Sequence, residues 1–128
     1  MKLLLDTCTF IWVVSDPTKL SASALAHFQD LANICYLSSV STWEIGVLTG
    51  LGRMHFSEPI ERYIPRMRRL QRIRPLRLLE SATLLSSNLP PHHRDPFDRM
   101  LICQAMAHGM TLLTPDTQIA KYSAPVIW

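Results

Sequence analysis

The sequence predicts an α/β sandwich, in which helices flank a mostly parallel central sheet. Short apolar runs of strand length alternate with helix-length segments along the chain, as in a series of strand–helix–strand units. Hydrophobic residues make up 48% of the 128 residues, enough for a packed core and too many for a disordered chain. The length fits a single domain over residues 1–128.

Five segments have the length and composition of strands. Residues 2–5 form a compact apolar run, typical of a strand that is buried on both faces. Residues 73–78 give the weakest signal, because Pro75 lacks the N–H that a sheet ladder requires. The remaining predicted strands are residues 34–37, 111–114 and 126–128.

Helices are expected between these strands, with boundaries set by capping residues. Ser21 is a good N-cap for a helix that runs to about residue 32. Asp95 and Pro96 start another helix, which His108 and Gly109 end. Further helices are expected near residues 12–14, from Ser41 to Gly50, from Ser57 and Pro59 onward with a kink or restart at Pro65, and over residues 80–87.

Four acidic residues stand at the points where a parallel sheet gathers its functional groups. Asp6 and Asp116 follow apolar strands, and Glu44 and Asp98 are expected in the first turns of helices. In open parallel sheets the carboxyl ends of the strands lie along one edge, where ligands bind. The sequence therefore predicts that these four carboxylates meet in one cleft.

Such a cluster is unfavourable unless a cation neutralises it, because neighbouring carboxylates oppose each other's ionisation. Magnesium and manganese prefer oxygen ligands and keep several waters when a few carboxylates hold them. A bound water becomes a better nucleophile, and the metal stabilises charge that develops on a phosphate. The four acids therefore indicate a Mg²⁺ or Mn²⁺ site that supports phosphodiester chemistry.

Each acid also has a structural interpretation. Ser41 and Glu44 have the spacing of a capping box, in which the glutamate bonds the amide of the cap residue. The dipole of the helix favours an anion at Asp98 in any case, and Asp116 is suited to a turn after its strand. Asp6 is the hardest to explain structurally, because a carboxylate directly after a core strand needs a partner.

Other polar residues are expected to support these acids without binding metal themselves. Thr7, Ser41 and Thr114 are placed to orient carboxylates or waters, although caps and local turn bonds explain them equally well. Asp95 is interpreted as a helix cap or a supporting residue. His93 is expected to lie in a loop and to form a hydrogen bond near the cleft.

Positive charge is concentrated in one part of the chain, which has a net charge of +3. One interpretation is a surface that binds RNA phosphates, and the other is a solvated helix face without a ligand. Contact with a protein partner is a third role for the same surface. The arginines assigned to RNA binding are Arg62, Arg66, Arg68, Arg69 and Arg72, and the run continues with Arg74 and Arg77. Arg94 and Arg99 are expected to pair with nearby acids.

The sequence also indicates the compartment. No apolar run approaches the roughly 20 residues that span a bilayer, and no signal-peptide pattern opens the chain. The cysteines Cys8, Cys35 and Cys103 are widely spaced and match neither a zinc motif nor a disulfide framework. We therefore expect buried thiols in a cytoplasmic protein that does not associate with membranes.

The acidic segments resemble the PIN-domain family, and specifically its VapC-like toxins of type II toxin–antitoxin systems. The resemblance implies a PIN-like three-layer sandwich and Mg²⁺- or Mn²⁺-dependent cleavage of RNA, with Asp6, Glu44, Asp98 and Asp116 as metal-site acids. It also implies a homodimer, and a cognate VapB-like antitoxin that covers the acidic cleft. The resembling segments are Leu3-Leu4-Leu5-Asp6-Thr7, Ser38 through Ile45, His93-Arg94-Asp95-Pro96-Phe97-Asp98-Arg99, Leu112-Leu113-Thr114-Pro115-Asp116 and Val126-Ile127-Trp128.

Two other functions remain to be considered. A phosphatase with an aspartyl nucleophile at Asp6 would normally need a second acid two residues later, where this chain has Cys8. A noncatalytic PIN-like module that binds RNA or a protein partner is compatible with the same sequence. Such a module would leave RNA intact with or without Mg²⁺.

Overall fold

The structure is a computed structural model that describes residues 1–128. Five strands form one sheet in the order β3-β2-β1-β4-β5, and every neighbouring pair is parallel. The predicted parallel sheet is therefore confirmed. The strands are β1 (Lys2–Leu5), β2 (Ile34–Ser38), β3 (Arg74–Leu76), β4 (Thr111–Leu113) and β5 (Val126–Ile127).

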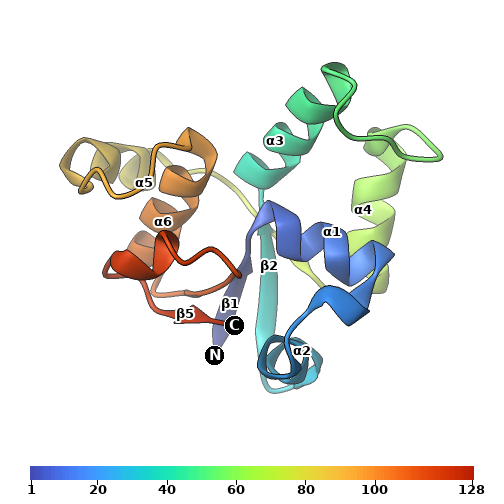
Figure 1. The fold of residues 1–128 in the computed structure, drawn as a ribbon, viewed down its shortest axis with the longest axis horizontal. Coiled ribbons are helices and arrows are strands. Elements are labelled where there is room, and N and C mark those ends of the chain that lie inside the picture. The colour runs from blue at the N-terminus through green and yellow to red at the C-terminus, as the bar shows by residue number, and fades with distance from the viewer.

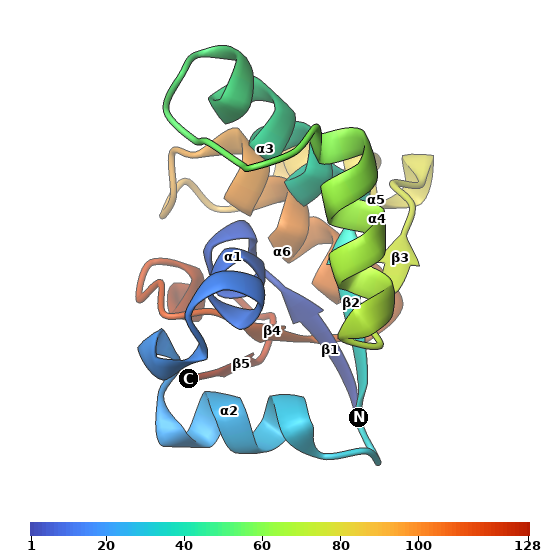
Figure 2. The ribbon, with the colours of Figure 1, turned by 90° about the vertical axis from the view of Figure 1, so that its right-hand side faces the viewer.

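Helices cover both faces of this sheet and make the fold a three-layer sandwich (Figure 1). Figure 1 shows α5 and α6 to the left of the strands and α1, α2 and α4 to the right, the side that faces the viewer in Figure 2. The helices are α1 (Thr7–Ser15), α2 (Ala22–Gln29), α3 (Ser39–Gly50), α4 (Ile60–Leu70), α5 (Glu80–Leu84) and α6 (Pro96–His108). Short 3₁₀ helices cover Pro17–Lys19, Leu85–Asn88 and Ile119–Lys121.

The central strand β1 is buried on both faces, as its apolar composition predicts. Leu4 packs with the cluster under α5 and α6, whereas Leu3 and Leu5 pack with the cluster under α1, α2 and α4. This alternation follows from the two-residue period of a strand. Leu5 is paired with Leu37 of β2 and with Leu113 of β4, so the carboxyl ends of the three central strands lie side by side, with β2 one residue longer.

Helix α3 lies at the carboxyl edge of the sheet and contributes to both halves of the core. Its residue Val40 belongs to the α5–α6 side, and Ile45 belongs to the opposite side. The helix starts at Ser39 and not at Ser41, because Ser38 provides the N-cap and accepts a hydrogen bond from the Val40 N–H. The predicted start of this helix was therefore wrong.

Two proline predictions have different outcomes. Pro75 is tolerated in β3 because this strand lies at the edge of the sheet and is only three residues long. Pro65 lies inside α4, which runs without interruption from Ile60 to Leu70, so the helix does not restart there. No helix of the protein is both long and apolar enough to cross a bilayer.

Candidate metal centre

Asp6 lies directly after β1 and caps helix α1. Its Oδ1 accepts a 2.7 Å hydrogen bond from the Thr9 N–H, and its Oδ2 accepts a 2.5 Å hydrogen bond from the Thr114 hydroxyl. Only 5% of the residue is exposed. Burial raises the pKa of this carboxyl, and the hydrogen bonds from Thr114 and Thr9 only partly oppose that effect. The carboxylate is therefore held in one orientation in an environment that disfavours its charge.

Asp116 occupies the turn after β4. Its backbone N–H donates to the Thr114 hydroxyl (3.1 Å), and its Oδ1 accepts from the Gln118 N–H (2.8 Å), which confirms the turn predicted here. Its Oδ2 lies 2.7 Å from Nε2 of His93. Burial acts to raise the pKa of Asp116, but the hydrogen bonds from His93 and Gln118 outweigh it and lower the pKa.

Helix α6 carries two acids at its start. Asp95 is the N-cap, with Oδ1 accepting a 2.9 Å hydrogen bond from the Phe97 N–H, and Asp98 follows in the first turn. The pKa of Asp98 is raised to about 7, mainly by burial and then by the negative charges of Asp95 and Asp6, while His93 opposes the increase. A nearby cation would therefore favour the ionised form of the Asp98 carboxyl.

Glu44 lies in the second turn of α3, so the predicted first-turn position and the capping box were both wrong. Its Oε1 accepts a 2.5 Å hydrogen bond from the Thr7 hydroxyl at the start of α1. Burial raises the pKa of Glu44 more than this hydrogen bond lowers it. Ser41 is fully buried and its hydroxyl has no hydrogen-bond partner, so it orients none of the acids.

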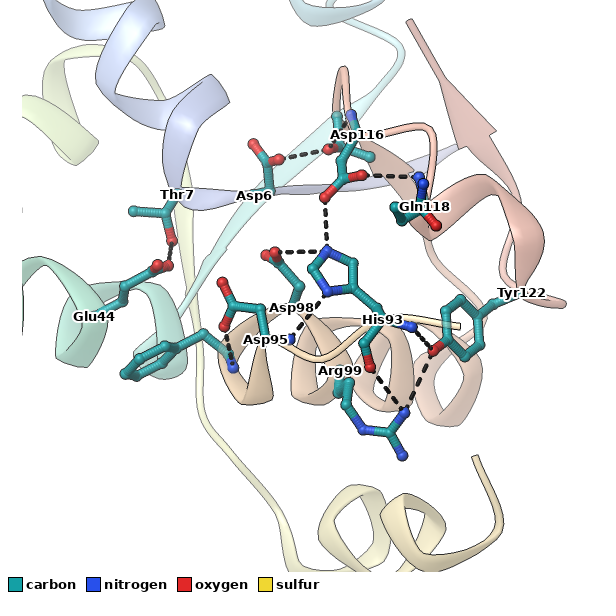
Figure 3. A network of polar contacts seen from close by, with 12 residues as sticks. Asp6, Thr7, Glu44, His93, Asp95, Asp98, Arg99, Asp116, Gln118 and Tyr122 are labelled. Atoms are coloured by element: carbon teal, nitrogen blue, oxygen red, sulfur yellow. Dashed lines mark hydrogen bonds and ion pairs between the residues drawn. The ribbon is translucent and has the colours of Figure 1, made fainter. Parts of the chain in front are cut away.

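Four of the predicted acids line one cleft of about 280 Å³ at the carboxyl edge of the sheet. Figure 3 shows Asp6, Asp98 and Asp116 around His93, with Glu44 and Thr7 beside them. Asp95 does not line this cleft, and its carboxylate is occupied by the helix cap. The complete lining is Asp6, Thr7, Cys8, Glu44, Asp98, Pro115 and Asp116.

A larger cavity of about 470 Å³ lies elsewhere, beside the residues that precede β2 and β3. None of the four acids lines it, and its titratable side chains are Asp30, Cys35, Arg72 and Arg74. The smaller cleft is the better candidate site because the carboxylates converge there. The volume of a cavity alone does not indicate which ligand it binds.

Cys8 is the one thiol in the cleft, and burial, followed by the charge of Asp6, raises its pKa to about 12. Metals bind the thiolate form, which is therefore not available at neutral pH. The ligand atoms that the cleft offers are carboxylate oxygens, which are the donors that Mg²⁺ and Mn²⁺ prefer. The donor set thus fits a hard divalent cation.

His93 lies beside the acidic cleft, between Asp98 and Asp116. Its Nε2 lies 2.7 Å from Oδ2 of Asp116 and 3.2 Å from Oδ2 of Asp98. The sequence indicated a hydrogen bond near the cleft, and the structure shows this bond with Asp116, while Asp98 lies within ion-pair distance of the same nitrogen. The position of His93 next to the acidic segment at Asp95 was the feature of the sequence that indicated this role. Asp116 is distant from His93 along the chain, so no local pattern could identify it as the partner.

Arg99 was expected to pair with an acid, and this expectation was wrong. Its guanidinium donates to the Tyr122 hydroxyl (3.3 Å) and to backbone carbonyl oxygens. Those oxygens belong to Ser86, Leu89, Pro90 and His93, at 3.4, 3.2, 2.9 and 3.3 Å. Arg99 therefore fixes the loop before α6 and leaves the carboxylates of the cleft unpaired with arginine.

The arginine-rich helix α4 does not reach the acidic cleft. Arg66 pairs with Glu58, whereas Arg68 is partly buried and lines a shallow hollow together with Thr42 of α3. The side chains of Arg62, Arg69 and Arg72 are exposed. These arginines give α4 and the turn after it a positively charged surface, and none of them lines the cleft.

The sequence is similar to that of a known protein family. The family model described as the PIN domain matches residues 3–125. The chain is 25% identical to Ribonuclease VapC22 of Mycobacterium tuberculosis over 126 residues, which cover 95% of this chain and 92% of that protein.

Solved structures share the fold. A chain of VapBC2 from Rickettsia felis, bound to a DNA fragment from its promoter, superposes with a TM-score of 0.74 at 16% identity, covering 99% of this chain and 98% of that one. A chain of VapBC-1 from nontypeable Haemophilus influenzae gives a TM-score of 0.65 at 17% identity, with 99% and 97% coverage. Because the family match spans nearly the whole sequence, the chain belongs to the PIN-domain family.

Proposed function

We propose that this protein is a metal-dependent endoribonuclease that acts as the toxin of a toxin–antitoxin pair. The observation that carries the proposal is the convergence of Asp6, Glu44, Asp98 and Asp116 in one cleft of a PIN-domain chain. The relative VapC22 is named a ribonuclease, which supports the proposed cleavage of RNA. The substrate is RNA, and the protein works in the cytoplasm as one domain over residues 1–128.

The four carboxylates would hold Mg²⁺ or Mn²⁺. When bound, the cation supplies positive charge that activates water for attack on a phosphodiester and stabilises the negative charge that develops. The protein contributes orientation: Thr114 fixes Asp6, and Thr7 fixes Glu44. Such outer hydrogen bonds hold ligands in place before the cation arrives.

Partner proteins are part of the proposal. VapBC complexes among the structural relatives support a cognate VapB-like antitoxin. Helix α3 and its C-cap residue also expose an apolar stripe, because Trp43 (64% exposed), Val47 (37%) and Leu51 (62%) recur at four-residue intervals. Such a stripe favours contact with another protein surface, either a second copy in a homodimer or the antitoxin.

Cleavage of a mixed pool of structured RNA tests the proposal. The purified, antitoxin-free protein is incubated with Mg²⁺, with Mn²⁺ and with EDTA, beside the variants Asp6→Asn and Asp30→Asn. Asp6→Asn keeps an oxygen that can accept from Thr9 but removes the charge, whereas Asp30 is an exposed acid outside the cleft. We expect metal-dependent cleavage that is lost in Asp6→Asn and retained in Asp30→Asn.

The opposite result has an equally clear meaning. A folded protein that binds RNA but leaves it intact under all three conditions would be a noncatalytic PIN-like binding module. Cleavage that persists in EDTA or in Asp6→Asn would show that RNA cleavage does not depend on the carboxylate cleft.

A further inference from the structure

The two ring nitrogens of His93 face groups of opposite kind. Nδ1 accepts a 3.1 Å hydrogen bond from the backbone N–H of Asp95. A ring nitrogen that accepts a hydrogen bond carries a lone pair and therefore no proton. The proton of the neutral ring must then be on Nε2, so the backbone of Asp95 selects the tautomer.

The protonated nitrogen Nε2 points at the two acids on either side of the ring. It forms a 2.7 Å hydrogen bond with Oδ2 of Asp116 and lies 3.2 Å from Oδ2 of Asp98, within ion-pair distance (Figure 3). Asp98 belongs to α6, whereas Asp116 belongs to the turn after β4. A single ring nitrogen thus contacts two acids that are carried by separate elements, and donates its hydrogen bond to one of them, Asp116.

We propose that His93 is a positioning residue, a hydrogen-bond donor of fixed tautomer that holds Asp116 beside Asp98 and does not itself bind the cation. The proposal rests on the proposed function for the presence of a cation at this site. Each carboxylate oxygen has two acceptor positions. An oxygen that accepts from His93 therefore keeps a second position with which to bind a cation.

Direct coordination by His93 conflicts with the hydrogen bond at Nδ1. An imidazole that binds a metal needs a bare nitrogen toward the ion, and its other nitrogen almost always donates to a carboxylate or carbonyl oxygen. Here the other nitrogen faces an N–H donor, the reverse of that arrangement. To bind through Nε2, the ring would have to break its hydrogen bond with Asp95 or lose its only proton.

The surroundings hold the ring in this position. The backbone N–H of His93 donates to the Tyr122 hydroxyl (2.7 Å), and the Arg99 guanidinium donates to the His93 carbonyl oxygen (3.3 Å). Arg99 also donates to the Tyr122 hydroxyl (3.3 Å), which closes the network. With 14% of the side chain exposed, water has little access to compete for these bonds.

The tautomer is tested first, by nitrogen-15 NMR of the histidine side chains in the metal-free protein. We expect the proton of the His93 ring on Nε2 and none on Nδ1. A proton on Nδ1 would overturn the proposal. This measurement needs neither metal nor RNA, so its result does not depend on the proposed function.

The second test is the dissociation constant of Mn²⁺, measured by calorimetry for the wild type, His93→Ala, His93→Gln and His92→Ala. Gln carries an amide N–H near the place of Nε2, whereas Ala carries no donor. His92 is exposed and packs edge-on against Tyr122, so it is the matched control. We expect Mn²⁺ binding to weaken about 10–100-fold in His93→Ala, to recover to within a few-fold in His93→Gln, and to stay unchanged in His92→Ala.

Several results would contradict the proposal. Unchanged binding in His93→Ala, or equal losses in the Ala and Gln variants, would show that the donated hydrogen bond does not matter. A nitrogen directly coupled to Mn²⁺ in the electron paramagnetic resonance spectrum, absent in His93→Ala, would make His93 a ligand. A wild type that binds no Mn²⁺ overturns this proposal together with the proposed metal site. If Mn²⁺ binding, the His93 tautomer and the affinities of the His93 variants are all as expected but the protein does not cleave RNA, only the proposed function is contradicted.

Discussion

The hydroxyl of Thr7 donates a 2.5 Å hydrogen bond to Oε1 of Glu44, and so joins the first residue of α1 to the second turn of α3. Glu44 reaches the cleft from a helix, whereas Asp6 and Asp116 reach it from strand ends. Its longer side chain has more rotatable bonds, and ordering it costs more conformational entropy. The Thr7 hydroxyl holds it in one of the available orientations.

Replacing Thr7 by Val should therefore weaken the proposed metal site. Val keeps the branched shape but removes the donor, so Glu44 loses the hydrogen bond that favours its ionised form. We expect Mn²⁺ affinity to fall by about 10-fold or more, as for other outer hydrogen bonds to metal ligands. Calorimetric titration with Mn²⁺ measures the change.

Ser41→Ala is the matched control for this substitution. It also removes a buried hydroxyl close to the cleft, but that hydroxyl has no partner to lose. We expect unchanged Mn²⁺ affinity and equal or slightly higher stability, because an unsatisfied buried hydroxyl is destabilising. A comparable loss of affinity in both variants would argue against a specific role for Thr7.

Asp98→Asn should stabilise the metal-free protein while abolishing activity. The pKa of Asp98 is about 7 in the folded protein, against an ordinary value of 3.8, so the folded state holds the proton more tightly than the unfolded state. Between pH 3.8 and about pH 7 the free energy of unfolding therefore falls as pH rises. Above this range the folded state bears the full cost of ionising the buried Asp98 carboxyl. We expect Asp98→Asn to raise the free energy of unfolding at pH 8 by roughly 1 kcal/mol or more.

Urea unfolding in EDTA at pH 8 and pH 5 measures this effect. At pH 5 the carboxyl of Asp98 is already protonated in the folded state, so the advantage of Asn should shrink. A variant that is less stable than the wild type at pH 8 would show that Asp98 is held by favourable contacts and not by an unfavourable burial of charge.

Metal affinity should depend on pH through the same residue. A carboxylate must be ionised to bind Mn²⁺, and Asp98, with a pKa of about 7, becomes protonated as pH falls through neutrality. We expect Mn²⁺ binding to weaken roughly tenfold between pH 8 and pH 6. Asp116 contributes nothing to this change, because its pKa is lowered and it stays ionised. Mn²⁺ titrations at pH 6, 7 and 8 measure this dependence, and a Mn²⁺ affinity that does not change with pH would contradict the prediction.

The positive surface of α4 is tested by Arg68→Ala combined with Arg69→Ala. If these residues contact RNA phosphates, the double variant should bind RNA more weakly and with a smaller dependence on salt, by about one unit of slope for each lost contact. Mn²⁺ affinity should not change, since neither residue lines the cleft. Lys2→Ala with Lys121→Ala removes the same charge from other parts of the surface. An unaltered salt slope in the arginine variant would rule out RNA contact and favour a protein partner.

Arg99→Lys should loosen the loop before α6. One guanidinium donates to four carbonyl oxygens and one hydroxyl, a geometry that a single ammonium group cannot reproduce. We expect a loss of about 1–3 kcal/mol in unfolding free energy, together with faster proteolysis between residues 85 and 95. Arg94→Lys, at an exposed position of the same segment, should change neither measurement.

The parts of the site that the sequence could predict depend on local rules. A strand end places Asp6 and Asp116, and the Asp95–Pro96 cap places Asp98, because strand period and helix capping act over a few residues. The position of Glu44 was misjudged by a turn because Ser38 competes with Ser41 for the N-cap, and only the packed helix decides between them. Tertiary packing also chose the carbonyl partners of Arg99, which no local pattern indicates.

The bond between Thr114 and Asp6 spans 108 residues, nearly the length of the chain. A protein growing from the ribosome exposes its first acid long before β4 can pair with β1 and bring the last one beside it. A chain in which β4 has not yet paired with β1 therefore lacks the complete cleft, even when its other elements have formed. Any function of the cleft depends on pairing between segments from opposite ends of the sequence, and so on the completed folding of the domain.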